Sequence, residues 1–321
     1  MTDAPFRYRR LGYVALNVAN LRRSVDFYRD TVGMDMTDFA EGQCAFLRCS
    51  DDHHDLVLFP GKEPGMKHLG FEMESDADFD AAATHLRALG VPFTDTPAAE
   101  AALLKQRKSL RFKVPGCGVT FELYSGSESA KAPYAPKVAN ILRLGHCVLK
   151  INHFDKSFAW LTENFGFKVS DHIKGDQGEI AFLRCWPSPY HHSLGIARSD
   201  RNQFHHVALM VGEIDDIGRG NNRLPRAGSR IVYGPGRHVA SGSVFLYFLD
   251  PDGMTLEYTY GMEEFAEHDP RQARQLEPTL DVADSWGGIP SPESFAVGVL
   301  EGSAPAMTTA QKKESMAARV F

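Results

Sequence analysis

The chain repeats its own sequence pattern, and the second copy begins about 135 residues after the first. Such a repeat constrains the fold strongly, because both copies are expected to form the same supersecondary unit. The clearest match is the run Ala-Phe-Leu-Arg-Cys, which stands at residues 45–49 and again, unchanged, at 181–185. Further matches join residues 11–18 to 144–151 and residues 118–122 to 253–257. A length of 321 residues, more than one core usually supports, agrees with two related domains.

Within each copy, alternating apolar residues predict strands, and a helical pattern follows the first of them. The expected helices are 24–33 and 157–166, where a Ser suits the start and a Gly suits the left-handed residue just past the end. Later helices are expected at 76–89 and 213–224. Each half therefore reads as strand, helix and three further strands, followed by the same pattern again. This predicts an α+β fold of tandem βαβββ units.

The segment 125–138, rich in Ser, Ala, Pro and Lys, is the expected boundary between the halves. We therefore place a first domain at residues 1–130 and a second at 138–290. The remaining tail, 291–321, is rich in Ser, Ala and Lys and weakly patterned, so it either wraps the fold or has no regular structure.

Composition excludes several classes of function. A net charge of −6 argues against a nucleic-acid-binding surface, which would be basic. No apolar run approaches the roughly 20 residues that cross a bilayer, and the first residues show no apolar signal region, so we expect a cytoplasmic protein. The five cysteines include no Cys-x-x-Cys pair, which favours reduced, buried thiols over disulfides or metal ligands.

Three residues of the second half, His146, His206 and Glu257, could bind one divalent metal ion. Alternate side chains of a strand share a face, so ligands on neighbouring strands can converge. Two imidazoles and one carboxylate form the facial triad of non-haem Fe(II) enzymes, which leaves about half of an octahedral shell open. His206, rather than His205, lies in register with His146, and His205 is then expected on the opposite face.

The first half carries a different set at the matching positions: Tyr13, His68 and Glu122. One of the three ligand types has been lost there, whereas the second half keeps all three. This pattern suits a duplicated unit of which one copy retains the metal. A second or degraded metal site at His68 and Glu122 is the less favoured alternative.

Residues 236–257 (GRHVASGSVFLYFLDPDGMTLE) complete a recognisable pattern: a His, a later Tyr, an acidic-Pro-x-Gly turn and a closing Glu. With two possible ligands upstream in the expected order, the chain resembles the type I extradiol ring-cleaving (catechol 2,3-) dioxygenases of the vicinal oxygen chelate superfamily over about residues 8–265. The resemblance implies paired βαβββ modules that form two barrel-like domains, of which only the C-terminal one holds an active metal.

The resemblance also implies roles for individual residues. His146, His206 and Glu257 become ligands of Fe(II), with Mn(II) as an alternative, and the substrates become a catechol and O2. His191 is expected to be the active-site acid–base, His238 to hydrogen-bond a substrate oxygen, and Tyr247 to contact the metal-bound substrate. These types suit the roles, because His exchanges a proton near neutral pH and Tyr donates a hydrogen bond without adding charge. His192 is expected, by alternation, to point away from the site.

Two departures bear on the substrate. Relatives that act on the carboxylated homoprotocatechuate carry an Arg where this chain has Tyr233, and an Asn where it has Val148. Both changes make the pocket less polar and favour an alkyl-, aryl- or ring-fused catechol. The resemblance further implies a homo-oligomer. Alternative functions are another metal enzyme on the same scaffold, such as a glyoxalase-like isomerase or a 2-oxo-acid dioxygenase, and a metal-free ligand-sequestering protein.

Overall fold

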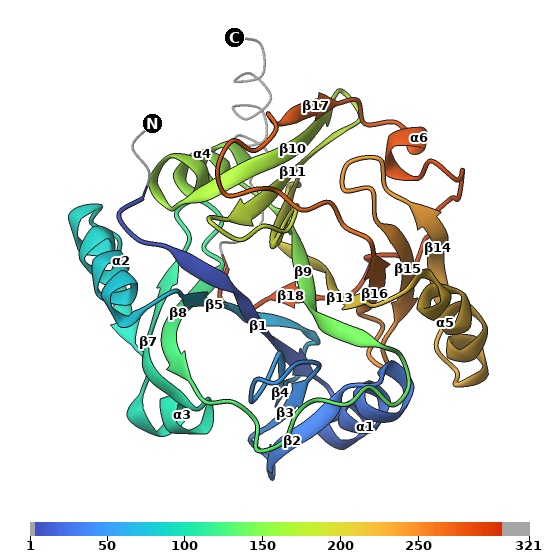
Figure 1. The fold of residues 1–321 in the computed structure, drawn as a ribbon, viewed down its shortest axis with the longest axis horizontal. Coiled ribbons are helices and arrows are strands. Elements are labelled where there is room, and N and C mark those ends of the chain that lie inside the picture. Colours follow the sequence, from blue (N-terminus) through green and yellow to red (C-terminus); the bar gives the residue numbers. More distant parts are fainter. Residues whose placement is uncertain (1–3, 304–321) are drawn as a thin grey trace.

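A computed structural model describes residues 4–303, which fold around two nine-stranded sheets (Figure 1). The first half contributes β1 (Tyr8–Val18), α1 (Leu21–Asp26), η1 (Phe27–Val32), β2 (Asp35–Ala40), β3 (Cys44–Arg48), β4 (Leu56–Pro60), β5 (Gly65–Met73), α2 (Asp76–Ala88), β6 (Phe93–Asp95), α3 (Ala98–Leu103), β7 (Gln106–Lys113) and β8 (Thr120–Ser127).

The second half repeats the strand series and the helices after its first and fifth strands, has no counterpart of η1 or α3 among the described residues, and then adds three short elements. They are β9 (Ile141–Ile151), α4 (Phe154–Asn164), β10 (Phe167–Gly175), β11 (Gly178–Cys185), β12 (Leu194–Arg198), β13 (Gln203–Val211), α5 (Ile214–Arg226), β14 (Ile231–Arg237), β15 (Val244–Leu249), β16 (Thr255–Tyr260), β17 (Arg274–Leu276), α6 (Leu280–Ala283) and β18 (Val299–Leu300).

The two sheets have the same strand order. In the first it is β2-β3-β4-β1-β5-β8-β7-β6, and in the second β10-β11-β12-β9-β13-β16-β15-β14. In both, the first strand of the half pairs in parallel with the fourth and antiparallel with the fifth. The predicted α+β fold of tandem βαβββ modules is confirmed, and the repeated sequence segments occupy equivalent strands.

The predicted helices are present, but two of them begin earlier than expected. Helix α1 begins after Asn20, whose side chain accepts a hydrogen bond from the Arg23 backbone, so the buried Ser24 lies inside the helix. Ser157 is likewise inside α4, where its hydroxyl accepts from the Cys117 backbone N–H instead of capping the helix. The expected left-handed glycines after these helices are confirmed at Gly33 (φ 102°) and Gly166 (φ 70°).

The two halves share one hydrophobic core. Tyr8 of β1 donates a 2.9 Å hydrogen bond to the Phe165 carbonyl, and the ring of Phe71 packs edge-on against Phe167 at 5.4 Å. A second contact joins the Tyr258 hydroxyl to the carbonyl of Val32 at 2.6 Å. Because these contacts are buried and cross the repeat, the two halves pack directly against each other.

The chain after β16 adds one strand to each sheet. β17 adds to the second sheet beside β10, and β18 adds to the first sheet beside β5 (Figure 1). The expected tail therefore wraps the fold as far as residue 303, and residues 304–321 lie outside the described part. The five cysteines are buried and form no disulfide, as expected. In the described residues no helix is long and apolar enough to cross a membrane.

Candidate metal centre and active site

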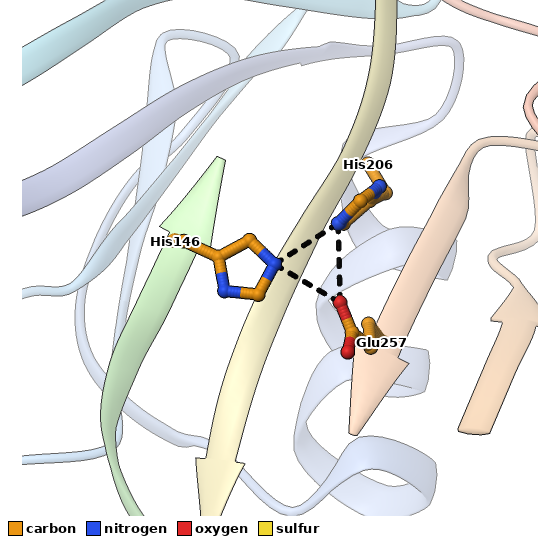
Figure 2. A group of neighbouring side chains, drawn as sticks. All are labelled: His146, His206 and Glu257. Carbon is orange, nitrogen blue, oxygen red and sulfur yellow. Dashed lines mark hydrogen bonds and ion pairs between the residues drawn. The ribbon is translucent and has the colours of Figure 1, made fainter. Parts of the chain in front are cut away.

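The three predicted ligands stand on three neighbouring strands, β9, β13 and β16. Ala208, in the central strand, pairs with His146 on one side and with Glu257 on the other. His206 lies two residues before Ala208, so its side chain emerges on the same face of the sheet. The strand register therefore brings the three side chains together (Figure 2).

The donor atoms of these residues form a nearly equilateral triangle. The Nε2 atoms of His146 and His206 are 3.1 Å apart, and each lies 3.1 Å from Oε2 of Glu257. In an octahedral shell with bonds of about 2.1 Å, adjacent donors at a right angle lie about 3.0 Å apart. The spacing is therefore that of one face of an octahedral metal site.

The charges of the triad also require a cation. All three side chains are buried. In the described part of the chain, neither carboxylate oxygen of Glu257 has a hydrogen-bond partner. Burial lowers the pKa of both His146 and His206, which favours neutral imidazoles with free lone pairs. A buried anion beside two neutral acceptors is costly without a positive charge, so the residues fit a divalent metal.

Beside the triad lies a cavity of about 180 Å³. Most of its wall is apolar, and among the described residues that line it none is Arg or Lys. Tyr233 and Val148, the two positions at which the sequence departs from the homoprotocatechuate pattern, both line it. The remaining lining residues come from several elements: His146, Ile173, Ile180, Phe182, His192, His205, His206, His238, Ala240, Ser241, Tyr247, Val282, Ala283 and Phe295.

His238 and Tyr247 lie together on this wall, as predicted from the signature. His238 donates from Nδ1 to the Ala283 carbonyl at 2.6 Å, and burial lowers its pKa, so its Nε2 is an acceptor. The Tyr247 hydroxyl lies 3.0 Å from that Nε2 and donates to it. Burial raises the pKa of Tyr247 well above its ordinary value, which keeps the hydroxyl protonated. Tyr247 pairs across β15 and β16 with Glu257, which places it beside the triad.

The neighbouring histidines 191 and 192 are arranged differently from the prediction. His192 lines the cavity, and its ring centroid is 4.0 Å from that of His146. His191 is fully buried away from the cavity lining, where its Nε2 lies 3.0 Å from Asp171. The expectation that His192 points away is wrong, because the pair precedes β12 and strand alternation does not apply outside the strand.

His205 also departs from strict alternation. It lines the cavity beside His206, and its ring stacks on Phe295 at 3.7 Å. The register of β13 against β9 shifts between Phe204 and His206, and such an irregularity redirects a side chain. The expectation that His205 lies on the opposite face is therefore wrong.

Comparisons with known proteins agree with this geometry. The model of the Glyoxalase/Bleomycin resistance protein/Dioxygenase superfamily matches residues 10–123 and 143–258. A manganese-dependent 2,3-dihydroxybiphenyl 1,2-dioxygenase from Geobacillus genomosp. 3 is 32% identical over 272 residues, covering 78% of this chain and 85% of that protein. This chain belongs to that superfamily, among its extradiol dioxygenases.

Two further relatives show the range of proteins similar to this member of the family. An iron-dependent extradiol dioxygenase from Rhodococcus jostii is 24% identical over 267 residues, covering 78% of this chain and 88% of that protein. The crystal structure of a Mn(II)-bound glyoxalase from Novosphingobium aromaticivorans superposes with a TM-score of 0.81 at 28% identity, covering 95% of this chain and 99% of that one.

Some residues of this extradiol dioxygenase site were missed by sequence reasoning. Phe295 and Val282 reach the cavity from the segment after β17, whose weak sequence pattern carries no signal of a site. Asp171, the buried partner of His191, stands in β10 as an isolated acidic residue. The His-His pair was visible, but choosing between its members required the conformation of the loop.

Proposed function

We propose that this protein is an oxidoreductase that opens a catecholic ring with O2, cleaving the carbon–carbon bond beside the two hydroxyls and incorporating both oxygen atoms. The observation that carries the proposal is the meeting of three metal-donor atoms, two of them on imidazoles that line a small cavity, beside further imidazoles and a phenol of the same cavity. These residues are His146, His206, Glu257, His192, His238 and Tyr247.

The metal we propose is Fe(II), with Mn(II) as the alternative, since relatives dependent on each metal are similar to this chain. His146, His206 and Glu257 would hold it. When bound, the ion supplies Lewis acidity to the two hydroxyl oxygens and a redox centre at which the catechol and O2 meet.

The residues around the cavity supply proton transfer and orientation. His192 faces the cavity and burial lowers its pKa, so it begins as a neutral base that accepts a proton from a catechol hydroxyl. The same imidazole can return the proton to an oxygen later in the reaction. His192 thus takes the acid–base role that the sequence assigned to His191. Tyr247, protonated and next to Glu257, and His238 hydrogen-bond the substrate oxygens.

For the substrate we propose a catechol with an alkyl, aryl or fused-ring substituent. Val148, Tyr233 and Phe295 present apolar or aromatic surface to the cavity. A substrate carboxylate would be desolvated there without a cationic partner among the described lining residues, which is costly. An apolar substituent instead gains from burial at about 25 cal/mol per Å².

A panel of catechols tests the proposal. Metal-loaded protein is incubated in air with catechol, 3-methylcatechol, 2,3-dihydroxybiphenyl, 1,2-dihydroxynaphthalene and 3,4-dihydroxyphenylacetate, and ring fission is followed by absorbance and mass spectrometry. We expect products 32 Da heavier than the substrate, and the lowest kcat/KM for the carboxylated compound. Substrate left intact by metal-replete protein would contradict the proposal.

The similarity to a glyoxalase supplies the second candidate. The same preparation is therefore assayed with the hemithioacetal of methylglyoxal and glutathione. Isomerisation of that compound without catechol cleavage would replace the dioxygenase proposal. The expected homo-oligomer stays a prediction, and light scattering of the purified protein tests it.

A further inference from the structure

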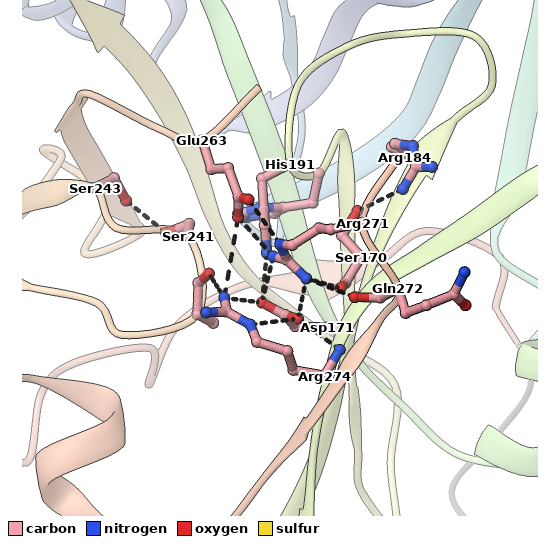
Figure 3. Close-up of polar contacts among 12 residues, drawn as sticks. Ser170, Asp171, Arg184, His191, Ser241, Ser243, Glu263, Arg271, Gln272 and Arg274 are labelled. Carbon is pink, nitrogen blue, oxygen red and sulfur yellow. Dashed lines mark hydrogen bonds and ion pairs between the residues drawn. The ribbon is translucent and has the colours of Figure 1, made fainter. Parts of the chain in front are cut away.

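A second buried polar cluster lies behind the cavity wall (Figure 3). Its centre is Asp171 of β10, which is fully buried. His191 approaches this carboxylate from the loop before β12, and Arg271 and Arg274 approach from the segment that follows β16. None of these four side chains lines the cavity, so the proposed chemistry gives them no direct part.

This cluster is already neutralised by protein cations. Arg271 contacts both Asp171 oxygens, at 2.9 and 3.1 Å, and Arg274 contacts Oδ1 at 3.1 Å from Nε and at 2.9 Å from its backbone N–H. The donor atoms of Asp171, His191 and Glu263 lie within 4.8 Å of one another, yet two guanidinium groups hold the place a metal would need. Burial opposes ionisation of Asp171, but these donors outweigh it and hold its pKa well below the ordinary range. Asp171 is therefore an anion that only accepts hydrogen bonds.

The hydrogen bonds then determine where each imidazole proton lies. Facing an anionic acceptor at 3.0 Å, His191 Nε2 carries a proton and donates it to Asp171. Burial lowers the pKa of His191 despite this carboxylate, so the ring is neutral and its Nδ1 bears a lone pair. His191 Nδ1 lies 3.0 Å from Nδ1 of His192, and the proton of that contact must come from His192. His192 is thus protonated on Nδ1, and its Nε2 is the nitrogen with a free lone pair.

We propose that His191, backed by Asp171, is a positioning residue that fixes the ring orientation and tautomer of His192 so that Nε2 serves as the base in the cavity. The inference rests on the proposed function for the identity of the reaction, but the tautomer itself does not depend on it.

The first half provides an internal comparison. His53 and His54 form the same Nδ1 to Nδ1 contact at 3.0 Å, and His54 packs edge-on against Tyr13. The residue equivalent to Asp171 is Asp38, because each pairs with the matching Phe of the next strand, Phe182 or Phe46. Asp38 is exposed, and no hydrogen bond joins it to His53 in the described structure. Both copies thus have the His-His contact, but of these two pairs in the described structure only that of His191 has a buried carboxylate at hydrogen-bond distance from its other ring nitrogen.

The backbone of His191 is held independently of its side chain. Its N–H donates to the Glu263 carbonyl at 2.9 Å, and the Glu263 N–H donates to the Ser241 carbonyl at 2.8 Å. Removing the imidazole of His191 therefore leaves the loop anchored. A substitution of His191 therefore reports the effect of losing its imidazole rather than a change in the backbone conformation of the loop.

The decisive measurement is the tautomer of His192 in metal-free, ¹⁵N-histidine-labelled protein, read from two-bond ¹H–¹⁵N spectra and assigned with His192→Gln. We expect a proton on Nδ1 and a bare Nε2. A proton on Nε2 in the unsubstituted protein would overturn the proposal, whether or not the enzyme cleaves catechols. Failure to cleave catechols with the expected tautomer would instead contradict only the proposed function.

Kinetics of variants give the second readout. His191→Leu removes both hydrogen bonds, and we expect kcat to fall about 10–100-fold while metal content and the KM for the catechol stay within twofold. His191→Gln can still donate to Asp171 and accept from His192, so it should recover most of that loss. His53→Leu is the matched control and should leave kcat unchanged. Equal losses in the Leu and Gln variants, or an unaltered kcat in both, would refute the positioning role.

Discussion

The two halves of the molecule place different side chains at the same three strand positions. In the second half His146, His206 and Glu257 leave three acceptor atoms facing one point. In the first half the Tyr13 hydroxyl takes the place of the first imidazole, donating to Glu122 at 2.6 Å and lying 2.8 Å from Nε2 of His68. One half thus has a site that needs a cation, and the other has a set of groups that satisfy one another.

The residue opposite the glutamate explains how the first half does without a metal. Arg111 pairs across β7 and β8 with Glu122, as Tyr247 pairs across β15 and β16 with Glu257. Arg111 donates from Nε to Oε2 of Glu122 at 2.6 Å. In the first half the guanidinium of Arg111 therefore supplies the positive charge that a metal ion would supply in the second half. The position equivalent to Arg111 is occupied there by the uncharged phenol of Tyr247. The comparison teaches that the buried glutamate at this strand position can be matched by a positive charge in either of two ways, from a side chain or from a bound ion.

The largest expected difference is in catalysis. Glu257→Gln removes the anionic ligand, so we expect metal retention to be lost and turnover to fall to background. Glu122→Gln should retain one metal per chain and the unsubstituted kcat, because Tyr13 and Arg111 already occupy both oxygens of Glu122. Metal analysis and catechol assays of both variants measure this. An equal loss of metal in Glu122→Gln would break the comparison.

The second difference concerns stability. Arg111→Met leaves Glu122 buried without its cation, and we expect a loss of about 3–5 kcal/mol in the free energy of unfolding. Tyr247→Phe, at the equivalent position, removes only a hydroxyl and should cost about 1 kcal/mol while lowering activity. Urea unfolding followed by circular dichroism measures both values. Similar costs for the two variants would show that Arg111 does not replace the ion.

Metal removal should lower the free energy of unfolding by a smaller amount, and only through the site in the second half. At a free Mn(II) concentration of 100 times Kd, binding stabilises the folded chain by about 2.7 kcal/mol, which chelation removes. Thermal unfolding with and without EDTA should show this shift in the unsubstituted protein and in Glu122→Gln. Glu257→Gln should show none, and a shift in that variant would place the ion elsewhere.

The smallest expected difference is the stability cost of changing the central-strand residue that lies between the first and third members of each set. Gly70 and Ala208 occupy the same position, each pairing with the first and third members of its set. A Cβ on Gly70 would lie 2.1 Å from the Tyr13 ring, so Gly70→Ala should cost about 1–3 kcal/mol through overpacking. Ala208→Gly should cost at most about 1 kcal/mol, through backbone entropy. Denaturation midpoints compare them, and a neutral Gly70→Ala would show that the tyrosine ring can move aside.

Much of the fold and the metal-ligand set could be predicted, because both follow from the internal repeat and from the two-residue period of strands. The repeated segments located equivalent strands, and the alignment of residues 206–211 with 146–151 selected His206 rather than His205 as a ligand. Strand alternation failed for His192 and His205, which lie in a loop and at a register shift where the period of two does not hold.

Other parts of the site depend on contacts between distant segments. Phe295 lies 90 residues after His205, the histidine on which it stacks (295 − 205), and no local sequence pattern predicts that contact. Asp171 is paired with Arg271 and Arg274, which follow β16 in the sequence and lie about 100 residues after Asp171. Such partners follow from the folded path of the chain rather than from spacing.

The pairing of β18 with β5 ties the end of the described chain to the first half. The segment that leads there carries Val282, Ala283 and Phe295 over the cavity before it reaches that strand. Part of the cavity wall thus belongs to a segment that runs from the second half of the chain to a strand of the first half. Expressed by itself, the later half ending at residue 290 would lack Phe295 and would lose the far attachment point of this segment. The first half therefore holds, through the pairing of β5 with β18, the end of a segment that forms part of the cavity wall.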